Sequence, residues 1–174
     1  MPKKINILFV APRFHTNQLY WVQALTSHGH RVNFFSLHRS IIEDYSCLNS
    51  ELIKISKISQ LIIKIFGDGG SNTYRGFPNP ISYYIMIKRI NPDMVIVRDI
   101  GRWFSLLTIL IAKLKKIKII IYSQTVLYNK RTRIRLLLFE LIFKITKGIW
   151  ITPIEGKLNK NIKIPSRLFF TPFA

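Results

Sequence analysis

The chain has 174 residues, of which 48% are hydrophobic, and its 27 Lys and Arg against 8 Asp and Glu give a formal net charge of +19. This length and hydrophobic content predict one folded domain with a buried core and argue against a disordered chain. The basic excess favours anionic partners, namely phosphates, anionic lipid headgroups or nucleic acid, and does not choose among them.

The sequence also excludes several classes of protein. The single cysteine, Cys47, cannot form an internal disulfide, and with four scattered histidines it does not give the ligand spacing of a zinc site, so we expect no metal. The apolar run behind the amino terminus is too short for a signal peptide. The two most apolar stretches, 103–112 and 134–145, are shorter than the roughly 20 residues that cross a bilayer. We therefore expect a cytoplasmic protein that does not span a membrane.

The first 37 residues predict a strand, a loop, a helix and a second strand. An apolar run at 5–11 is followed by a polar loop at 12–17 and an amphipathic stretch, and Gly29 stands where a helix commonly ends. A second apolar run covers 32–37. This order opens a parallel α/β sheet, in which ligands bind beyond the carboxyl ends of the strands.

The later segments continue the alternation of strands and helices. We predict strands at 51–55, 94–97, 117–122, 149–152 and 168–171, and helices at 103–114, at 131–146, over the shared face of Ile58, Leu61, Ile62 and Ile65, and from Asn79-Pro80 to the residues before Asn91-Pro92. The fold class is therefore predicted as α/β, a Rossmann-like doubly wound parallel sheet flanked by helices, in a single domain over residues 1–170.

Polar residues follow three of the predicted strands, and a parallel sheet would gather them at one edge. They are His15, Thr16, Asn17, Arg98, Asp99, Gly101, Arg102, Ser123 and Gln124. Simpler interpretations are a His15 that is solvated or acts as a cap, and an Asp99 that caps the next helix. Neither a GxxxxGKS phosphate loop nor a GxGxxG fingerprint occurs, which disfavours an ATPase or a nicotinamide dehydrogenase, and we expect no cofactor.

Four basic residues, Lys130, Arg131, Arg133 and Arg135, stand at the amino end of the predicted 131–146 helix. Positive charge there opposes the helix dipole by roughly 0.3 to 1 kcal/mol per group. Anionic lipid offers roughly 1 kcal/mol per basic residue, which favours contact with a membrane surface. A basic helix in solvent is the alternative.

Several of these segments carry a family resemblance: 4–10, 23–25 with 29–32, 91–97, 112–114 and 119–123. In these segments the chain resembles the amino-terminal, acceptor-side domain of GT-B fold glycosyltransferases, specifically the family 4-like sugar transferases. The resemblance implies the acceptor-binding half of an enzyme that transfers a sugar from a nucleoside-diphosphate sugar to a lipid-linked or polysaccharide acceptor. It further implies a peripheral position on the inner face of the cell membrane.

The resemblance also implies roles for single residues. His15, Thr16 and Asn17 would approach the donor phosphates, and Arg98, Asp99 and Gln124 would lie on the acceptor side, with Asp99 and His15 catalytic. Residues 171–174 resemble the start of a linker to a second half that binds the donor, so the chain alone is expected to be inactive. Many relatives have glycines where this chain has Pro12, Arg13 and Phe14.

Two other functions remain open at this point. The chain could be a non-catalytic half that recruits a donor-binding polypeptide to the membrane. A nucleic-acid binder is favoured only by the charge, because the sequence has no recognition-helix or aromatic RNA-binding motif, and we expect no nucleic-acid partner.

Overall fold

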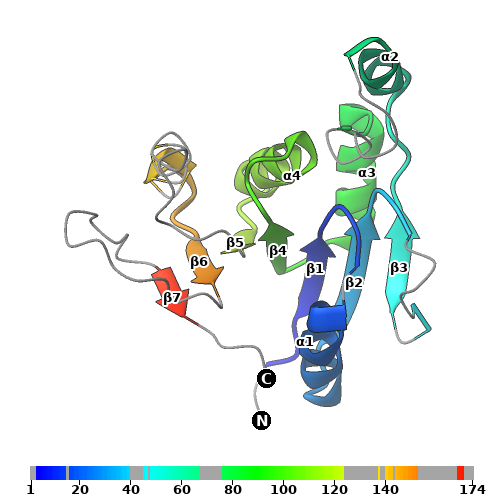
Figure 1. Ribbon diagram of the computed structural model, residues 1–174. Helices are drawn as coiled ribbons and strands as arrows, with labels where there is room; N and C mark the ends of the chain where they lie inside the picture. The colour runs from blue at the N-terminus through cyan, green and yellow to red at the C-terminus, as the bar shows by residue number, and fades with distance from the viewer. Residues whose placement is uncertain are drawn as a thin grey trace.

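The computed structural model describes residues 3–14, 16–39, 45–46, 48–66, 76–123, 137, 140–142, 144–152 and 168–170, without the side chains of residues 16, 17, 66, 168 and 170. Its centre is a parallel sheet of seven strands in the order β3-β2-β1-β4-β5-β6-β7 (Figure 1). The strands are β1 Asn6–Val10, β2 Arg31–Ser36, β3 Asn49–Leu52, β4 Met94–Arg98, β5 Lys118–Tyr122, β6 Ile149–Thr152 and β7 Leu168–Phe170.

Helices cover both faces of this sheet, as the doubly wound prediction requires. They are α1 Thr16–Ser27, α2 Lys57–Phe66, α3 Pro80–Ile90 and α4 Trp103–Leu114, and residues 137, 140–142 and 144–146 are also helical. Helix α1 lies on one side of the sheet, and α2, α3 and α4 lie on the other (Figure 1). The predicted Rossmann-like α/β fold is confirmed. The domain limits remain a prediction, and residues 171–174 lie outside the described part.

The buried core divides into two clusters because side chains alternate across each strand. On the α1 side, Ile7 and Phe9 of β1 pack with Val22 of α1. On the opposite side, Leu8 and Val10 pack with residues of α3 and α4, including Tyr83 and Phe104. Strands that are buried on both faces explain the continuous apolar runs in the sequence.

Local sequence signals determine where the first helix ends. Gly29 has a φ of 80°, and the backbone N–H groups of Gly29 and His30 donate to the carbonyls of Thr26 and Leu25 at 2.8 and 3.0 Å. This is a Schellman ending, which requires a left-handed residue and therefore favours glycine.

Helix α3 has a cap at each end. The Asn79 side chain accepts from the backbone N–H groups of Ile81 and Ser82, and Pro80 occupies the first helical position. At the other end Asn91 is left-handed, with a φ of 47°. Both predicted boundaries of this helix are confirmed.

The described residues contain neither a membrane-spanning helix nor a cluster of metal-ligating side chains. None of the described helices has the length and hydropathy that a bilayer crossing would need. In the same part of the chain, no three or more His, Cys, Asp or Glu side chains gather in a way that could hold a metal ion.

Candidate functional site

The strand order reverses next to β1, because β2 and β3 extend the sheet on one side of it and β4 to β7 extend it on the other. Val10 of β1 is in register with Val97 of β4, and Arg98 of β4 with Tyr122 of β5. The carboxyl ends of the three strands therefore meet at one edge. In open parallel sheets this switch point is where ligands bind.

The loop after β1 is tied to the end of β2. The backbone N–H of Ala11 donates to the Phe35 carbonyl at 3.1 Å, and the Pro12 carbonyl accepts from Leu37 and His38 at 3.0 and 3.2 Å. These bonds satisfy backbone groups that a buried loop would otherwise leave unpaired.

The buried ring of Phe14 fixes the same loop to the core. Phe14 is only 1% exposed, and its ring packs edge-on against Phe34 at 5.2 Å and tilted against Tyr45 at 5.5 Å between centroids. This packing explains why the position carries a large apolar residue, because a glycine there would leave a cavity in the core.

Of the three residues predicted to approach the donor phosphates, the structure describes two by their backbone alone and does not describe the third. His15 lies outside the described residues. Thr16 begins α1, so the amino end of this helix stands at the switch-point edge, and the side chains of Thr16 and Asn17 are not described. The roles of these three residues stay predictions.

Asp99 lies in contact with two other polar residues of the edge. Its φ is 54°, and its backbone N–H donates to the Tyr122 carbonyl at 2.9 Å. The Ser123 hydroxyl donates to its Oδ1 at 3.2 Å, and Nε of Arg98 lies 3.8 Å from its Oδ2. The Asp99 side chain is 31% exposed, so a carboxylate held from two sides still reaches solvent.

The alternative in which Asp99 caps the next helix is wrong. The cap position of α4 is Arg102, in extended conformation and without a side-chain cap hydrogen bond. The left-handed turn at Asp99 instead lets its carboxylate meet both Arg98 and Ser123, although adjacent residues in a regular strand point to opposite faces.

One end of the β4–α4 loop is held by a hydrogen bond, whereas Gly101 within the loop is exposed to solvent. The Ser105 hydroxyl donates to the Arg98 carbonyl at 2.8 Å and holds the start of α4 against the strand end. Gly101 is exposed, and a Cβ built on it would meet no atom within 4 Å. A ligand can therefore approach the backbone here.

Of the predicted site residues, the structure brings Arg98, Asp99 and Ser123 into contact and places Gly101 and Arg102 on the adjoining loop. Ser123 is 1% exposed, and its backbone N–H donates to the Ile151 carbonyl at 3.1 Å. Gln124 and the four basic residues Lys130, Arg131, Arg133 and Arg135 lie outside the described part.

Sequence reasoning missed Gln18 in the first turn of α1. This side chain is polar and yet only 2% exposed. The available signal was its spacing, since Gln18, Val22 and Leu25 share one helical face, and an amide on a core-facing stripe is unusual. It adds a buried polar group close to the start of α1.

Chemically, the edge offers a carboxylate that is positioned by a hydroxyl and a guanidinium. A carboxylate held in this way can accept a proton or a hydrogen bond from a substrate hydroxyl, whereas a guanidinium and free backbone amides bind anions. The described part is therefore suited to a polar substrate that carries hydroxyl groups.

Solved glycosyltransferases have a similar fold. The chain aligns over 99% of its length with 51% of the Spinosyn Forosaminyltransferase SpnP, at a TM-score of 0.63 and 11% identity. It aligns over 96% of its length with 45% of MurG from Acinetobacter baumannii (TM-score 0.55, 11% identity). For CalG4, the Calicheamicin Glycosyltransferase, the shares are 98% and 53% (TM-score 0.52, 12% identity). No protein-family model and no curated protein sequence matches the chain.

The chain therefore has the fold of one half of GT-B glycosyltransferases and spans about half the length of these structures. The resemblance to the amino-terminal GT-B domain is confirmed at the level of the fold. None of these comparisons identifies family 4, and that narrower assignment stays a prediction.

Proposed function

We propose that this protein is the acceptor-binding half of a glycosyltransferase that transfers a sugar from a nucleoside-diphosphate sugar to a lipid-linked or polysaccharide acceptor. The observation that supports this most directly is the Asp99 carboxylate, held by Ser123 at the switch-point edge of a half GT-B fold. The donor would be held chiefly by a second half.

In this proposal Asp99 is the catalytic residue on the acceptor side. It accepts the proton of the acceptor hydroxyl while that oxygen forms a bond to the anomeric carbon and the bond from this carbon to the diphosphate breaks. Arg98, Gly101, Arg102 and Gln124 would bind the acceptor around it, and the buried Ser123 would contribute to the acceptor site by holding the Asp99 carboxylate in place. His15, with Thr16 and Asn17 at the start of α1, would stabilise the charge of the departing diphosphate.

The proposal also places the protein at the inner face of the cell membrane. The basic residues Lys130, Arg131, Arg133 and Arg135 would contact anionic headgroups there. Without the second half the chain would bind acceptor and transfer no sugar.

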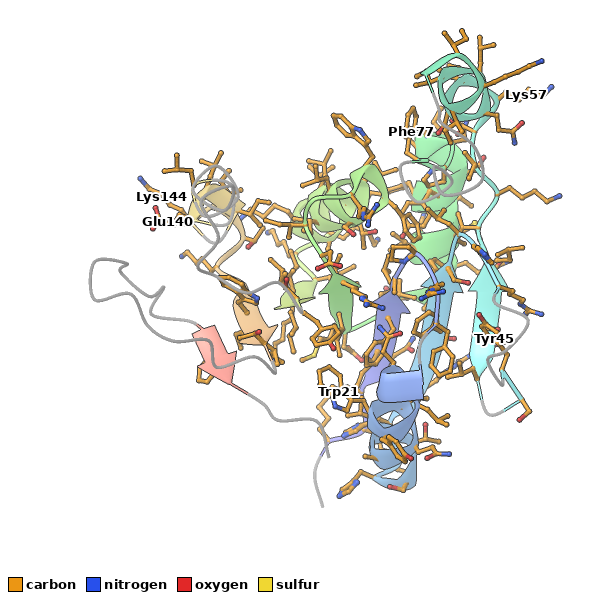
Figure 2. All side chains as sticks on the ribbon, in the orientation of Figure 1. Trp21, Tyr45, Lys57, Phe77, Glu140 and Lys144 are labelled. Carbon is orange, nitrogen blue, oxygen red and sulfur yellow. The ribbon has the colours of Figure 1, made fainter. Side chains whose placement is uncertain are left out.

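The test is glycosyl transfer by a chain or a pair of chains that carries both halves. Asp99→Asn and His15→Ala are each expected to lower kcat about 10²-fold or more, the usual contribution of a general acid or base. Glu140→Gln is the matched control, because this carboxylate is exposed and belongs to a helical segment and not to the loops that follow β1, β4 and β5; Figure 2 shows where it lies. Full activity of a folded Asp99→Asn variant would exclude the catalytic role of Asp99.

A second candidate is a non-catalytic half that recruits a donor-binding polypeptide to the membrane. The net charge of +19 favours contact with an anionic membrane in this case as well. Co-elution of the chain with a donor-half polypeptide, together with transfer that survives Asp99→Asn, would favour it over the catalytic proposal.

A further inference from the structure

Helix α2 turns its apolar stripe toward solvent. Ile58, Leu61, Ile62 and Ile65 share one helical face and are 68%, 57%, 45% and 62% exposed. The opposite side is held by a polar contact, in which Ser59, 2% exposed, accepts the backbone N–H of Phe77 at 3.0 Å. In a globular protein the apolar stripe of a surface helix ordinarily faces the core, so this orientation needs a reason.

The other helices on this side of the sheet expose apolar side chains in the same way. In the part of the chain that the structure describes, thirteen of the seventeen exposed large apolar side chains lie on α2, α3, α4 and the helical residues 137, 140–142 and 144–146. We call these thirteen the outer helical face: Ile58, Leu61, Ile62, Ile65, Ile81, Tyr84, Ile85, Trp103, Leu110, Leu114, Leu137, Leu141 and Ile145.

An apolar cavity interrupts this face between the start of α3 and α4. Its volume is about 450 Å³, and it is lined by Phe77, Pro80, Trp103, Leu106, Leu107 and Leu110. Among the described residues that line it, the indole N–H of Trp103 is the single polar side-chain group. A peptide segment in the cavity would therefore find almost no side-chain partner for its backbone N–H and carbonyl groups, whereas a hydrocarbon chain needs none.

The charges around the face are almost all positive. Exposed lysines Lys57, Lys64, Lys113 and Lys144 lie on the same helices, and Figure 2 shows Lys57 and Lys144 on this side of the sheet. Within the described residues of these helices, Glu140 is the single acidic side chain. An apolar stripe bordered by lysines is the pattern of helices that lie in the interface of an anionic membrane.

We propose that the outer helical face is the surface by which this protein lies on an anionic lipid bilayer, with its apolar side chains in the headgroup–acyl boundary and its lysines at the phosphates. This proposal rests on the proposed action at a membrane, and it assigns the contact to α2, α3, α4 and the helical residues Leu137, Leu141 and Ile145. The face reaches Trp103, which directly follows Arg102 of the candidate site. A lipid-linked acceptor can thus present its polar head to Asp99 while its hydrocarbon stays in the bilayer.

Flotation of the full chain with vesicles of equal parts phosphatidylglycerol and phosphatidylcholine tests the assignment. Leu61→Ser with Ile65→Ser, and separately Trp103→Ser with Leu110→Ser, are expected to lower the floated fraction at least tenfold. The matched control is Tyr20→Ser with Leu52→Ser, because these side chains are 58% and 48% exposed and lie outside the face. Pure phosphatidylcholine is expected to float much less protein.

A fluorescence measurement checks that the face itself enters the lipid. The chain has three tryptophans, of which Trp103 is 65% exposed, Trp150 is fully buried and Trp21 is half-buried. Adding the anionic vesicles should shift the emission to the blue, and Trp103→Phe should abolish most of that shift.

Several results would overturn the assignment. Face variants that float like the control would do so, as would flotation that depends only on Lys130, Arg131, Arg133 and Arg135. Face variants that turn a dimer into a monomer without changing flotation would identify a contact between two copies instead. Transfer to a soluble acceptor by the two-half enzyme is expected to be unchanged in the face variants, so failure of the catalytic proposal and failure of the membrane face are distinguishable.

Discussion

Asp99 is expected to stabilise the fold in two ways: an aspartate tolerates the left-handed backbone conformation at this position, and its carboxylate accepts a hydrogen bond from Ser123. Two substitutions separate these two effects from the effect of its negative charge. Asp99→Ala removes the acceptor of the Ser123 hydroxyl and places an alanine at a φ of 54°. Asp99→Asn keeps an oxygen for Ser123 and a residue that tolerates the left-handed region, and loses only the negative charge.

The magnitudes follow from these contacts. A hydrogen bond to a charged group contributes about 1.5 to 3 kcal/mol, and the left-handed region costs alanine about 1 kcal/mol. The pair with Arg98 has a separation of 3.8 Å and a partly exposed carboxylate, so it adds at most about 1 kcal/mol. We expect Asp99→Ala to lower the free energy of unfolding by about 3 kcal/mol and Asp99→Asn by about 1 kcal/mol.

Urea and thermal unfolding of the isolated chain measure this difference. About 2 kcal/mol between the variants corresponds to roughly 4 to 8 °C in Tm for a protein of this size. A cycle that combines Asp99→Ala with Ser123→Ala should show a coupling of about 1.5 to 3 kcal/mol, because the two side chains share this hydrogen bond. Equal losses in the two Asp99 variants, or additive losses in the cycle, would refute the reasoning.

Substitutions at three further positions test a buried hydrogen bond and two helix ends. Thr108 donates to the Phe104 carbonyl, so the Tyr83 hydroxyl must donate to Thr108 at 2.8 Å, and Tyr83→Phe is expected to cost about 1 kcal/mol at neutral pH by urea unfolding. Burial raises the pKa of Tyr83 above its ordinary value near 10, so the folded chain keeps a proton that the unfolded chain loses and stability falls as the pH rises past about 10. Tyr83→Phe should make that alkaline decline shallower, and an unchanged slope would contradict the buried position. Asn79→Ala removes the cap of α3 and should cost about 1 kcal/mol, while Asn79→Ser should recover most of it in the same assay; equal losses would argue against the cap. Gly29→Ala forces a side chain into a φ of 80° and is expected to lower stability by about 1 kcal/mol, and an unchanged Tm would show that the turn relaxes.

Much of the fold follows from signals that lie within a few residues of one another. The helix over 103–114 and the strand over 149–152 have the predicted bounds, and the helix from Asn79-Pro80 ends where it was expected. Caps, prolines and apolar periodicity act over one or two turns, so the sequence alone is enough to place them. The parallel order of the strands follows from their alternation with helices, and it is what allowed the switch-point edge to be anticipated.

The partners of the site residues could not be anticipated in the same way. Asp99 was expected either to cap the next helix or to reach a substrate, and its contact with Ser123 depends on how β4 and β5 lie in register. Two residues 24 positions apart carry no local signal of their contact.

The sequence by itself determined most of the helices and strands, because these depend on short-range chemistry, although the strand predicted at 51–55 lies at Asn49–Leu52. The alternation of these elements indicated the edge at which polar residues gather. Only the tertiary structure decided which apolar faces are covered. The stripe of Ile58, Leu61, Ile62 and Ile65 has the spacing of a core-facing helix, yet it is exposed. Whether an apolar stripe is buried depends on which other segments of the chain pack against it, and the periodicity of the stripe does not predict those contacts.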